Sequence, residues 1–220
     1  MVVRTQFICS NCGYESAKWY GRCPSCQSWN TFSEFKAQDS LRKSQALDIA
    51  SSSEPTQIGR IKSEAASRMP TGFWELDRVL GGGIVPGSAV LLSGDPGVGK
   101  STLLLELARN VARSPVLSTP EVKKAPTSGV SVLYVSGEES EGQIKIRAER
   151  IGVGKNANLL IFANGDIDQV IKAAEKVKPD FLIIDSIQTM SSAEFPGFAG
   201  SLPQLRNATS RIVSYAKRNN

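Results

Sequence analysis

Histidine is absent from this sequence of 220 residues. Its absence excludes Ser-His-Asp and Cys-His catalysis, and with them the zinc hydrolases that hold their metal through imidazole. Any reaction must therefore depend on carboxylates, lysine, hydroxyls, thiolates or a bound metal ion.

Long apolar runs are also missing. No stretch of about 18 apolar residues occurs, so the sequence predicts no membrane-spanning helix. The segment from Met1 to Phe7 lacks the apolar core of a secretory signal, which fits a bacterial cytoplasm and equally an organellar protein without its transit peptide. The net charge of +5 and the pI of about 9.1 are compatible with a polyanionic partner without identifying one.

The few cysteines are clustered at one end of the chain. All four lie in the first 26 residues, as two C-x-x-C pairs separated by ten residues. Two such turns facing each other complete a tetrahedral shell of four thiolates, so we expect structural zinc in a small module spanning residues 1–36. The predicted ligands are Cys9, Cys12, Cys23 and Cys26. Two disulfides or a redox pair are the alternatives, but disulfides need an oxidising compartment and a redox pair needs a strand-helix context.

Aromatic residues also concentrate in this module. Trp19, Tyr20 and Trp29 occur beside Lys18 and Arg22. They either form the core that so small a module needs, or provide a surface for stacking or protein docking. Sequence leaves both interpretations open.

The remainder divides into a linker and a core. Residues 37–68 are polar and poor in aromatics, which is typical of a linker, with a short helix expected from Leu41 to Ala50. Residues 69–220 alternate between apolar runs and helix-length segments, which predicts an α/β fold with a mostly parallel sheet. The expected strands are Ala89 to Ser93, Val130 to Ser136, Leu159 to Ala163 and Phe181 to Asp185. The expected helices are Ser101 to Arg113, Ser140 to Ile151, Ile167 to Val177 and Leu202 to Lys217.

Two longer connections interrupt this alternation. The segment from Ser114 to Gly129 contains three prolines and is interpreted as a surface insertion. The segment from Ser191 to Ser201 follows a strand at the carboxyl edge of the sheet, where open α/β sheets bind ligands. We expect that second loop to contact a partner.

A glycine-rich loop precedes the first long helix of the core. Its sequence matches G-x-x-x-x-G-K-[ST], in which backbone N–H groups and a helix N-terminus surround phosphate groups. The predicted nucleotide-binding residues are Gly94, Asp95, Pro96, Gly97, Val98, Gly99, Lys100, Ser101 and Thr102. Lys100 would contact the β- and γ-phosphates, and the Ser101 hydroxyl would ligate Mg²⁺. The alternative is a glycine-rich turn with a structural role only and no ligand.

Acidic residues end two of the predicted strands. Asp185 closes the Phe181 to Asp185 run, as expected for the aspartate that holds the Mg²⁺ shell in P-loop proteins. Glu138 and Glu139 follow the Val130 to Ser136 run, and one of them would orient or deprotonate water. Glu138 is preferred, because Ser136-x-x-Glu139 and Ser140-x-x-Gln143 both resemble helix capping boxes.

Four blocks of sequence carry a family resemblance. They are FICSNCGYESAKWYGRCPSCQSWNTF, TGFWELDRVLGGGIVPGSAVLLSGDPGVGKSTLL, VLYVSGEES and LIIDSIQT. Together they resemble the bacterial RadA (Sms) family of RecA-like DNA repair ATPases, which carry an N-terminal zinc ribbon. The similarity covers nearly the whole chain.

The resemblance implies a RecA-like P-loop NTPase core that uses ATP and Mg²⁺, preceded by a four-cysteine zinc ribbon with Zn²⁺. It implies an ATP hydrolase that binds single-stranded and branched DNA, assembles as a homo-oligomeric ring, drives branch migration in recombination and works beside a recombinase or helicase. Lys100, Ser101 and Asp185 take the Walker roles by this match, and Glu138 takes that of the catalytic carboxylate. The loop from Ser191 to Ser201 falls where such rings contact DNA.

The sequence also departs from the family. Family members continue through further core strands, a Lys-Asn-Arg-Phe-Gly motif and a domain similar to Lon protease, none of which occurs here. We therefore expect a sheet that is incomplete at its C-terminal side and a fragment that turns over ATP poorly alone. An alternative from another class is a RecA-like regulatory switch, in which ATP sets assembly and the ribbon recruits a protein without DNA translocation.

Overall fold

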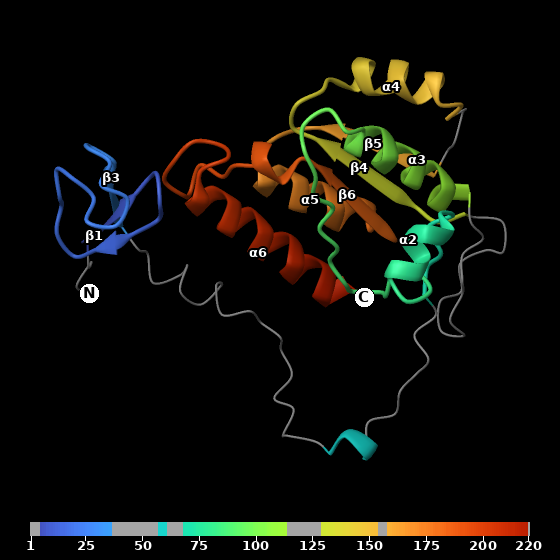
Figure 1. Ribbon diagram of the computed structural model, residues 1–220, viewed down its shortest axis with the longest axis horizontal. Helices are drawn as coiled ribbons and strands as arrows, with labels where there is room; N and C mark the ends of the chain where they lie inside the picture. Colours follow the sequence, from blue (N-terminus) through green and yellow to red (C-terminus); the bar gives the residue numbers. More distant parts are fainter. Residues whose placement is uncertain (1–4, 37–56, 61–67, 114–128, 154–157, 220) are drawn as a thin grey trace.

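The computed structural model describes residues 5–36, 57–60, 68–113, 129–153 and 158–219 (Figure 1). The predicted helix from Leu41 to Ala50, most of the predicted linker and nearly all of the predicted insertion lie outside these residues. Within them, a small N-terminal ribbon lies beside a larger α/β core. No helix in the described part is both long and apolar enough to cross a membrane.

The ribbon is a three-stranded antiparallel sheet. Its strands are β1 (Thr5–Cys9), β2 (Glu15–Ser16) and β3 (Phe32–Lys36), in the order β2-β1-β3. Cys9, Cys23 and Phe32 form its buried centre. So small a sheet buries little apolar surface, which makes it dependent on a further staple such as a metal.

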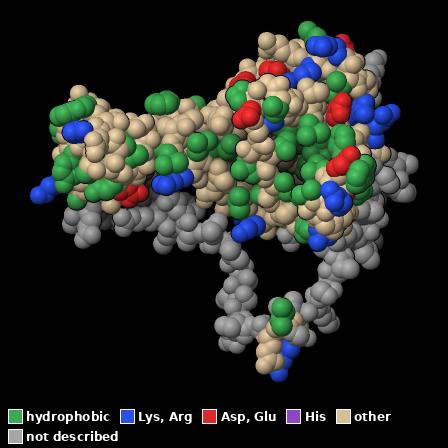
Figure 2. Space-filling model, in the orientation of Figure 1, with side chains coloured by type: hydrophobic (Ala, Val, Ile, Leu, Met, Phe, Trp, Pro, Cys, Tyr) green, Lys and Arg blue, Asp and Glu red, His purple; other side chains and the backbone are tan. Residues whose placement is uncertain are grey.

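The ribbon aromatics do not fill this centre. Trp19 is 54% exposed and Trp29 is 68% exposed, so the interpretation that they form the core is wrong for both. Figure 2 shows hydrophobic side chains, in green, on the surface of the ribbon. Tyr20 lies with its ring centroid 5.9 Å from that of Phe32 but remains 42% exposed. Cys9, Cys23 and Phe32 already occupy the interior, with the partly buried Cys12 and Cys26 packed against them, which leaves the indole rings at the surface.

The core sheet has three parallel strands. They are β4 (Val132–Ser136), β5 (Leu159–Ala163) and β6 (Phe181–Asp185), in the order β5-β4-β6. The predicted bounds of β5 and β6 are confirmed, and β4 begins two residues later than predicted. Ser136 is in register with Ala163 on one side and Asp185 on the other, so all three strands end at one edge.

The predicted strand from Ala89 to Ser93 is wrong. Residues 88–95 form no strand, and Val90 and Leu91 are 56% and 79% exposed. A strand requires a neighbour to complete its hydrogen-bond ladder. Among the described strands β6 pairs with β4 alone, and no strand pairs with this apolar segment.

Helices cover both faces of the sheet (Figure 1). Val132 and Tyr134 face α2 (Trp74–Val79), α3 (Lys100–Arg113) and α4 (Glu141–Arg150), while Leu133 and Val135 face α5 (Ile167–Val177) and α6 (Leu202–Asn219). This alternation is the period of two that a strand imposes on its side chains. The 3₁₀ turns η1 (Ile58–Arg60) and η2 (Ile187–Thr189) complete the described elements.

Capping side chains set the helix starts. Ser140 caps α4 and forms a capping box with Gln143, as predicted, while Asp166 caps α5. The second predicted box does not begin a helix: the Ser136 hydroxyl accepts from the N–H groups of Glu138 and Glu139 in the turn before α4. The predicted bounds of α5 are confirmed, those of α3 and α6 differ by one or two residues at one end, and those of α4 differ by one residue at each end.

Candidate nucleotide site and metal centre

The four cysteine sulfurs converge on one point in the ribbon. They lie within 4.8 Å of one another, with 3.7 Å between the sulfurs of Cys9 and Cys26 and 3.6 Å between those of Cys12 and Cys23. A tetrahedral zinc site with Zn–S bonds of about 2.3 Å requires sulfurs about 3.8 Å apart. All four cysteines are free thiols in the structure, so they form neither of the two disulfides of the alternative interpretation.

Matching turns present the two cysteine pairs. The Gly13 N–H donates to the Cys9 carbonyl at 2.8 Å, and the Gln27 N–H donates to the Cys23 carbonyl at 2.9 Å. Both donors have left-handed backbones, with φ of 74° at Gly13 and 60° at Gln27. Each turn thus folds back immediately after its second cysteine and directs both thiols of the pair inward.

The thiols differ in acidity. Hydrogen bonds from Ser28 and Asn11 lower the pKa of Cys26 to about 5, whereas burial raises the pKa of Cys12 to about 11. Metal binding requires thiolates and a cation would stabilise all four together. The donor set and its spacing therefore fit a tetrahedral metal ion of the zinc class.

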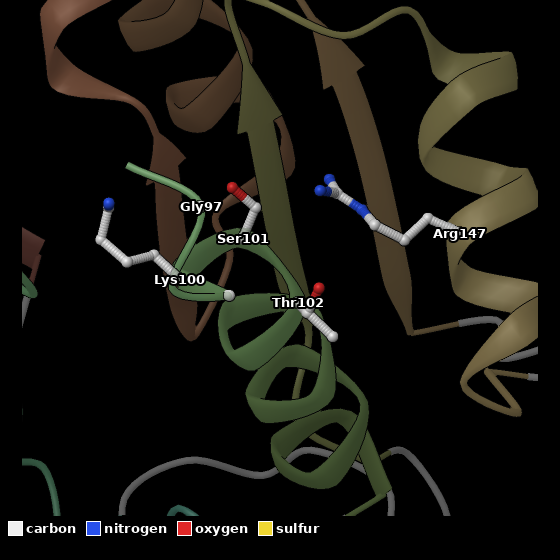
Figure 3. A pocket seen from close by; sticks show the side chains of 6 residues that line it. Gly97, Lys100, Ser101, Thr102 and Arg147 are labelled. Atoms are coloured by element: carbon white, nitrogen blue, oxygen red, sulfur yellow. The ribbon is translucent and has the colours of Figure 1, made fainter. Parts of the chain in front are cut away.

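The glycine-rich loop leads directly into α3, which begins at Lys100. Gly97 and Gly99 adopt φ of 80° and 94°, a region that favours glycine, although added Cβ atoms there would meet nothing within 4 Å. Conformation, not crowding, thus accounts for both glycines. Beside them is an open cavity of about 200 Å³ (Figure 3). The residues lining it are Gly97, Gly99, Lys100, Ser101, Thr102 and Arg147.

The Lys100 ammonium group is held by its own loop. It donates to the Gly94 carbonyl at 2.8 Å and to the Asp95 carbonyl at 2.7 Å. In Figure 3 the side chain extends away from Arg147, which lies across the cavity from the loop. These two bonds leave one N–H donor of the ammonium group without a partner in the described part of the chain.

Asp185 ends β6 in contact with the neighbouring strand. The Tyr134 hydroxyl, on β4, donates to its Oδ2 at 2.5 Å. Burial, followed by the hydrogen bond to Asp185, raises the pKa of Tyr134 far above its ordinary value, so the phenol remains a neutral donor. Sequence reasoning missed Tyr134, because only the parallel register of β4 and β6 brings these side chains together.

The two glutamates after β4 have different environments. Glu138 is exposed and accepts a hydrogen bond from the Ser186 hydroxyl at 3.1 Å, immediately beyond Asp185. Glu139 forms an ion pair with Arg147 of α4. Of these two glutamates, only Glu139 therefore has a cationic partner among the described residues.

Comparison with known proteins supports the same division of the chain. The family profile described as an AAA domain matches residues 55–195. The chain belongs to the AAA domain family. A second profile, described as a rubredoxin metal binding domain, matches residues 7–34 and so includes all four cysteines.

Curated relatives of this AAA domain protein carry the name DNA repair protein RadA. The one from Mycobacterium tuberculosis is 43% identical over 217 residues, which cover 98% of this chain and 42% of the relative. Those from Listeria monocytogenes and Aquifex aeolicus are 42% and 40% identical over 216 and 222 residues, covering 98% and 99% of this chain and 44% of each relative. The chain thus spans less than half the length of these relatives.

A loop of the AAA domain follows η2 and has a defined shape. The Gln204 side chain of α6, 1% exposed, accepts from the Ser192 N–H at 2.9 Å and donates to the carbonyls of Ser192 and Phe195 at 3.0 and 2.7 Å. Phe198 is 71% exposed on the same loop. The predicted partner loop from Ser191 to Ser201 is therefore fixed at its base and presents an apolar side chain to solvent.

The metal-binding ribbon touches the α/β core next to this loop. A Cβ added at Gly13 would lie 3.5 Å from Arg206 Nη1 and 3.6 Å from Pro203 Cγ, at the start of α6. A Cβ added at Gly197 would lie 3.4 Å from the Ser10 carbonyl oxygen. Both glycines thus lie where the two modules approach closely.

Proposed function

We propose that this chain is the N-terminal part of a DNA-dependent ATPase of recombinational DNA repair, which binds single-stranded and branched DNA and promotes branch migration. The observation that carries the proposal is the glycine-rich loop at the start of α3, together with a sheet edge bearing Asp185 and Glu138. The printed name of the relatives, DNA repair protein RadA, supports the biological setting.

The residues of the loop fit a nucleoside triphosphate. Backbone N–H groups at the start of α3 and the Lys100 ammonium group would bind its phosphates, favoured by the positive end of the helix dipole. Ser101 and Asp185 would hold Mg²⁺, which supplies charge neutralisation during phosphoryl transfer. Tyr134 orients Asp185 through its hydrogen bond, leaving the other carboxylate oxygen for this task.

Glu138 is the group proposed to act on water. Its contact with the Ser186 hydroxyl fixes it beside the end of β6, and no cation neutralises it among its described contacts. A carboxylate in this position can orient a water molecule or accept its proton. Glu139 is less suited, because it faces Arg147 of α4, whereas Glu138 contacts the residue that follows Asp185.

The size of the cavity bears on activity of this chain alone. Sites for complete small ligands occupy roughly 300 to 1,000 Å³. The cavity of about 200 Å³ accommodates the phosphates better than a whole nucleotide. We therefore expect weak nucleotide binding by the chain alone and turnover mainly in the longer protein.

The test is ATP hydrolysis by the longer protein that contains this chain. Activity should require Mg²⁺, rise with single-stranded DNA and fall by about two orders of magnitude or more in Lys100→Ala, since a positioned cation on the transferred phosphate contributes on this scale. Glu138→Gln should bind nucleotide but hydrolyse it slowly. Full activity of Lys100→Ala would refute the mechanism.

A second candidate is a regulatory switch that recruits a protein through the ribbon. The observation that favours it is the exposure of Trp19 and Trp29 on a module whose centre is already filled. DNA titration at several salt concentrations separates the candidates. DNA affinity that falls steeply with salt supports the DNA-dependent ATPase, whereas no binding at low salt supports the switch.

A further inference from the structure

Arg147 is a lining residue of the phosphate cavity that does not belong to the glycine-rich loop. The other five lining residues come from that loop and the first turn of α3, whereas Arg147 reaches across from α4 (Figure 3). Its side chain is only 20% exposed, and its Nε atom is buried without a hydrogen-bond partner in the described part of the chain. A buried guanidinium nitrogen that lacks an acceptor has a free-energy cost, which a rearrangement of the Arg147 side chain that provides an acceptor would lower.

The charge of Arg147 is balanced by one carboxylate. Its Nη2 atom pairs with Oε2 of Glu139, which lies on the turn between β4 and α4. The guanidinium group has five N–H donors in a planar fork that matches phosphate as well as carboxylate. The group carries a single positive charge, so a phosphate at the cavity would compete with Glu139 for it.

Lys100, the other cation that lines the cavity, is held by its own loop. Its ammonium group is bound to two carbonyls of the loop. Arg147 is therefore the lining cation whose guanidinium group points toward Ser101 in Figure 3, while its counter-ion is a carboxylate of the turn before α4.

We propose that Arg147 is a phosphate-binding residue that exchanges its partner Glu139 for a phosphate oxygen of the bound nucleotide. The proposal rests on the nucleotide site proposed above and extends it to α4. Glu139 then acts as an internal competitor, since it occupies the guanidinium group until a phosphate displaces it. Nucleotide binding would free the Glu139 carboxylate from Arg147. The charge next to Glu138, on the turn between β4 and α4, would then depend on whether nucleotide is bound.

This exchange predicts opposite effects for the two partners. Arg147→Gln removes the cation and should weaken binding of ADP and ATP by about tenfold or more, on the scale of a charge-assisted hydrogen bond. Glu139→Gln removes the competitor and should tighten binding by about two- to fivefold, since a partly exposed ion pair is worth little more than this. In the double variant the Glu139 substitution should have no effect on nucleotide affinity.

The experiment is calorimetric titration of the longer protein that contains this chain with Mg²⁺-ADP and Mg²⁺-ATP, and with adenosine as a ligand without phosphate. Arg150→Gln is the matched control, because Arg150 is an exposed arginine of the same helix. Arg147→Lys keeps the charge without the planar fork and should give an intermediate affinity, which also serves if the glutamine variant folds poorly. Adenosine affinity should not change in any of these variants.

The possible results are distinct. Weakening by Arg147→Gln, tightening by Glu139→Gln and loss of the Glu139 effect in the double variant support the exchange. If both single substitutions weaken binding equally, the pair only stabilises α4 and the proposal is wrong. If wild type binds nucleotide, Lys100→Ala does not and Arg147→Gln matches wild type, this inference fails while the nucleotide site stands. If wild type binds no nucleotide at all, both fall together.

Discussion

The hydrogen bonds of Gln204 predict a large effect of one substitution outside the glycine-rich loop. Gln204 is 1% exposed and makes three bonds of 3.0 Å or less, to the N–H and carbonyl of Ser192 and the carbonyl of Phe195. Gln204→Ala leaves these backbone groups without their partner. At about 1 kcal/mol for each net hydrogen bond, the free energy of unfolding should fall by about 3 kcal/mol. This is a large fraction of the roughly 5 to 15 kcal/mol typical of domains.

Urea denaturation of the chain measures this loss, and a second variant tests its cause. Gln204→Glu keeps the volume and the acceptor for Ser192 N–H but places an oxygen against the carbonyls, so it should destabilise at least as much as Gln204→Ala. Thr209→Ala, at an exposed position of α6, should change the free energy of unfolding by less than about 0.5 kcal/mol. A loss below about 1 kcal/mol in Gln204→Ala, or tolerance of Gln204→Glu, would show that these bonds do not fix the loop.

Two further predictions concern the metal centre and Tyr134. Elemental analysis of freshly reduced protein should find about one equivalent of zinc per chain, and Cys12→Ser should lower it sharply because a tetrahedral shell needs all four ligands; less than half an equivalent in wild type would contradict the metal site. Because the pKa of Tyr134 is raised, its phenol stays protonated in the folded state at pH values where the same phenol ionises in the unfolded chain. The contribution of Tyr134 to the free energy of unfolding is therefore complete below pH about 10 and is lost as pH rises. Urea denaturation between about pH 9 and 11, on either side of the ordinary tyrosine pKa, should therefore show a steeper loss for wild type than for Tyr134→Phe; parallel curves would count against this account.

Local patterns predicted most of the core. The apolar runs of β5 and β6 have the bounds expected from sequence, because each run is short and ended by polar residues. The capping box of Ser140 and Gln143 also follows from sequence alone, since its partners lie three residues apart. The cysteine spacing predicted a convergence of four sulfurs that the structure contains.

Features that depend on distant neighbours could not be predicted in this way. The Ala89 to Ser93 run has the composition of a buried strand, but a strand exists only with a partner, and a local pattern contains no information about partners. Tyr134 and Arg147 belong to the candidate site through strand register and the direction of α4, respectively. The exposure of Trp19 and Trp29 follows from how little interior the ribbon has once its cysteines converge.

The close approach of Gly13 to Pro203 and Arg206 has a consequence for how the two modules respond to damage. Gly13 belongs to the turn that presents Cys9 and Cys12, so the shape of that turn depends on its metal ligands. The same turn abuts the first residues of α6, whose Gln204 holds the loop beyond η2. The ribbon therefore supports the start of α6. Oxidation of its thiols would change the shape of the turn at Gly13 and thereby displace α6 and the loop of residues 191–201 that Gln204 holds.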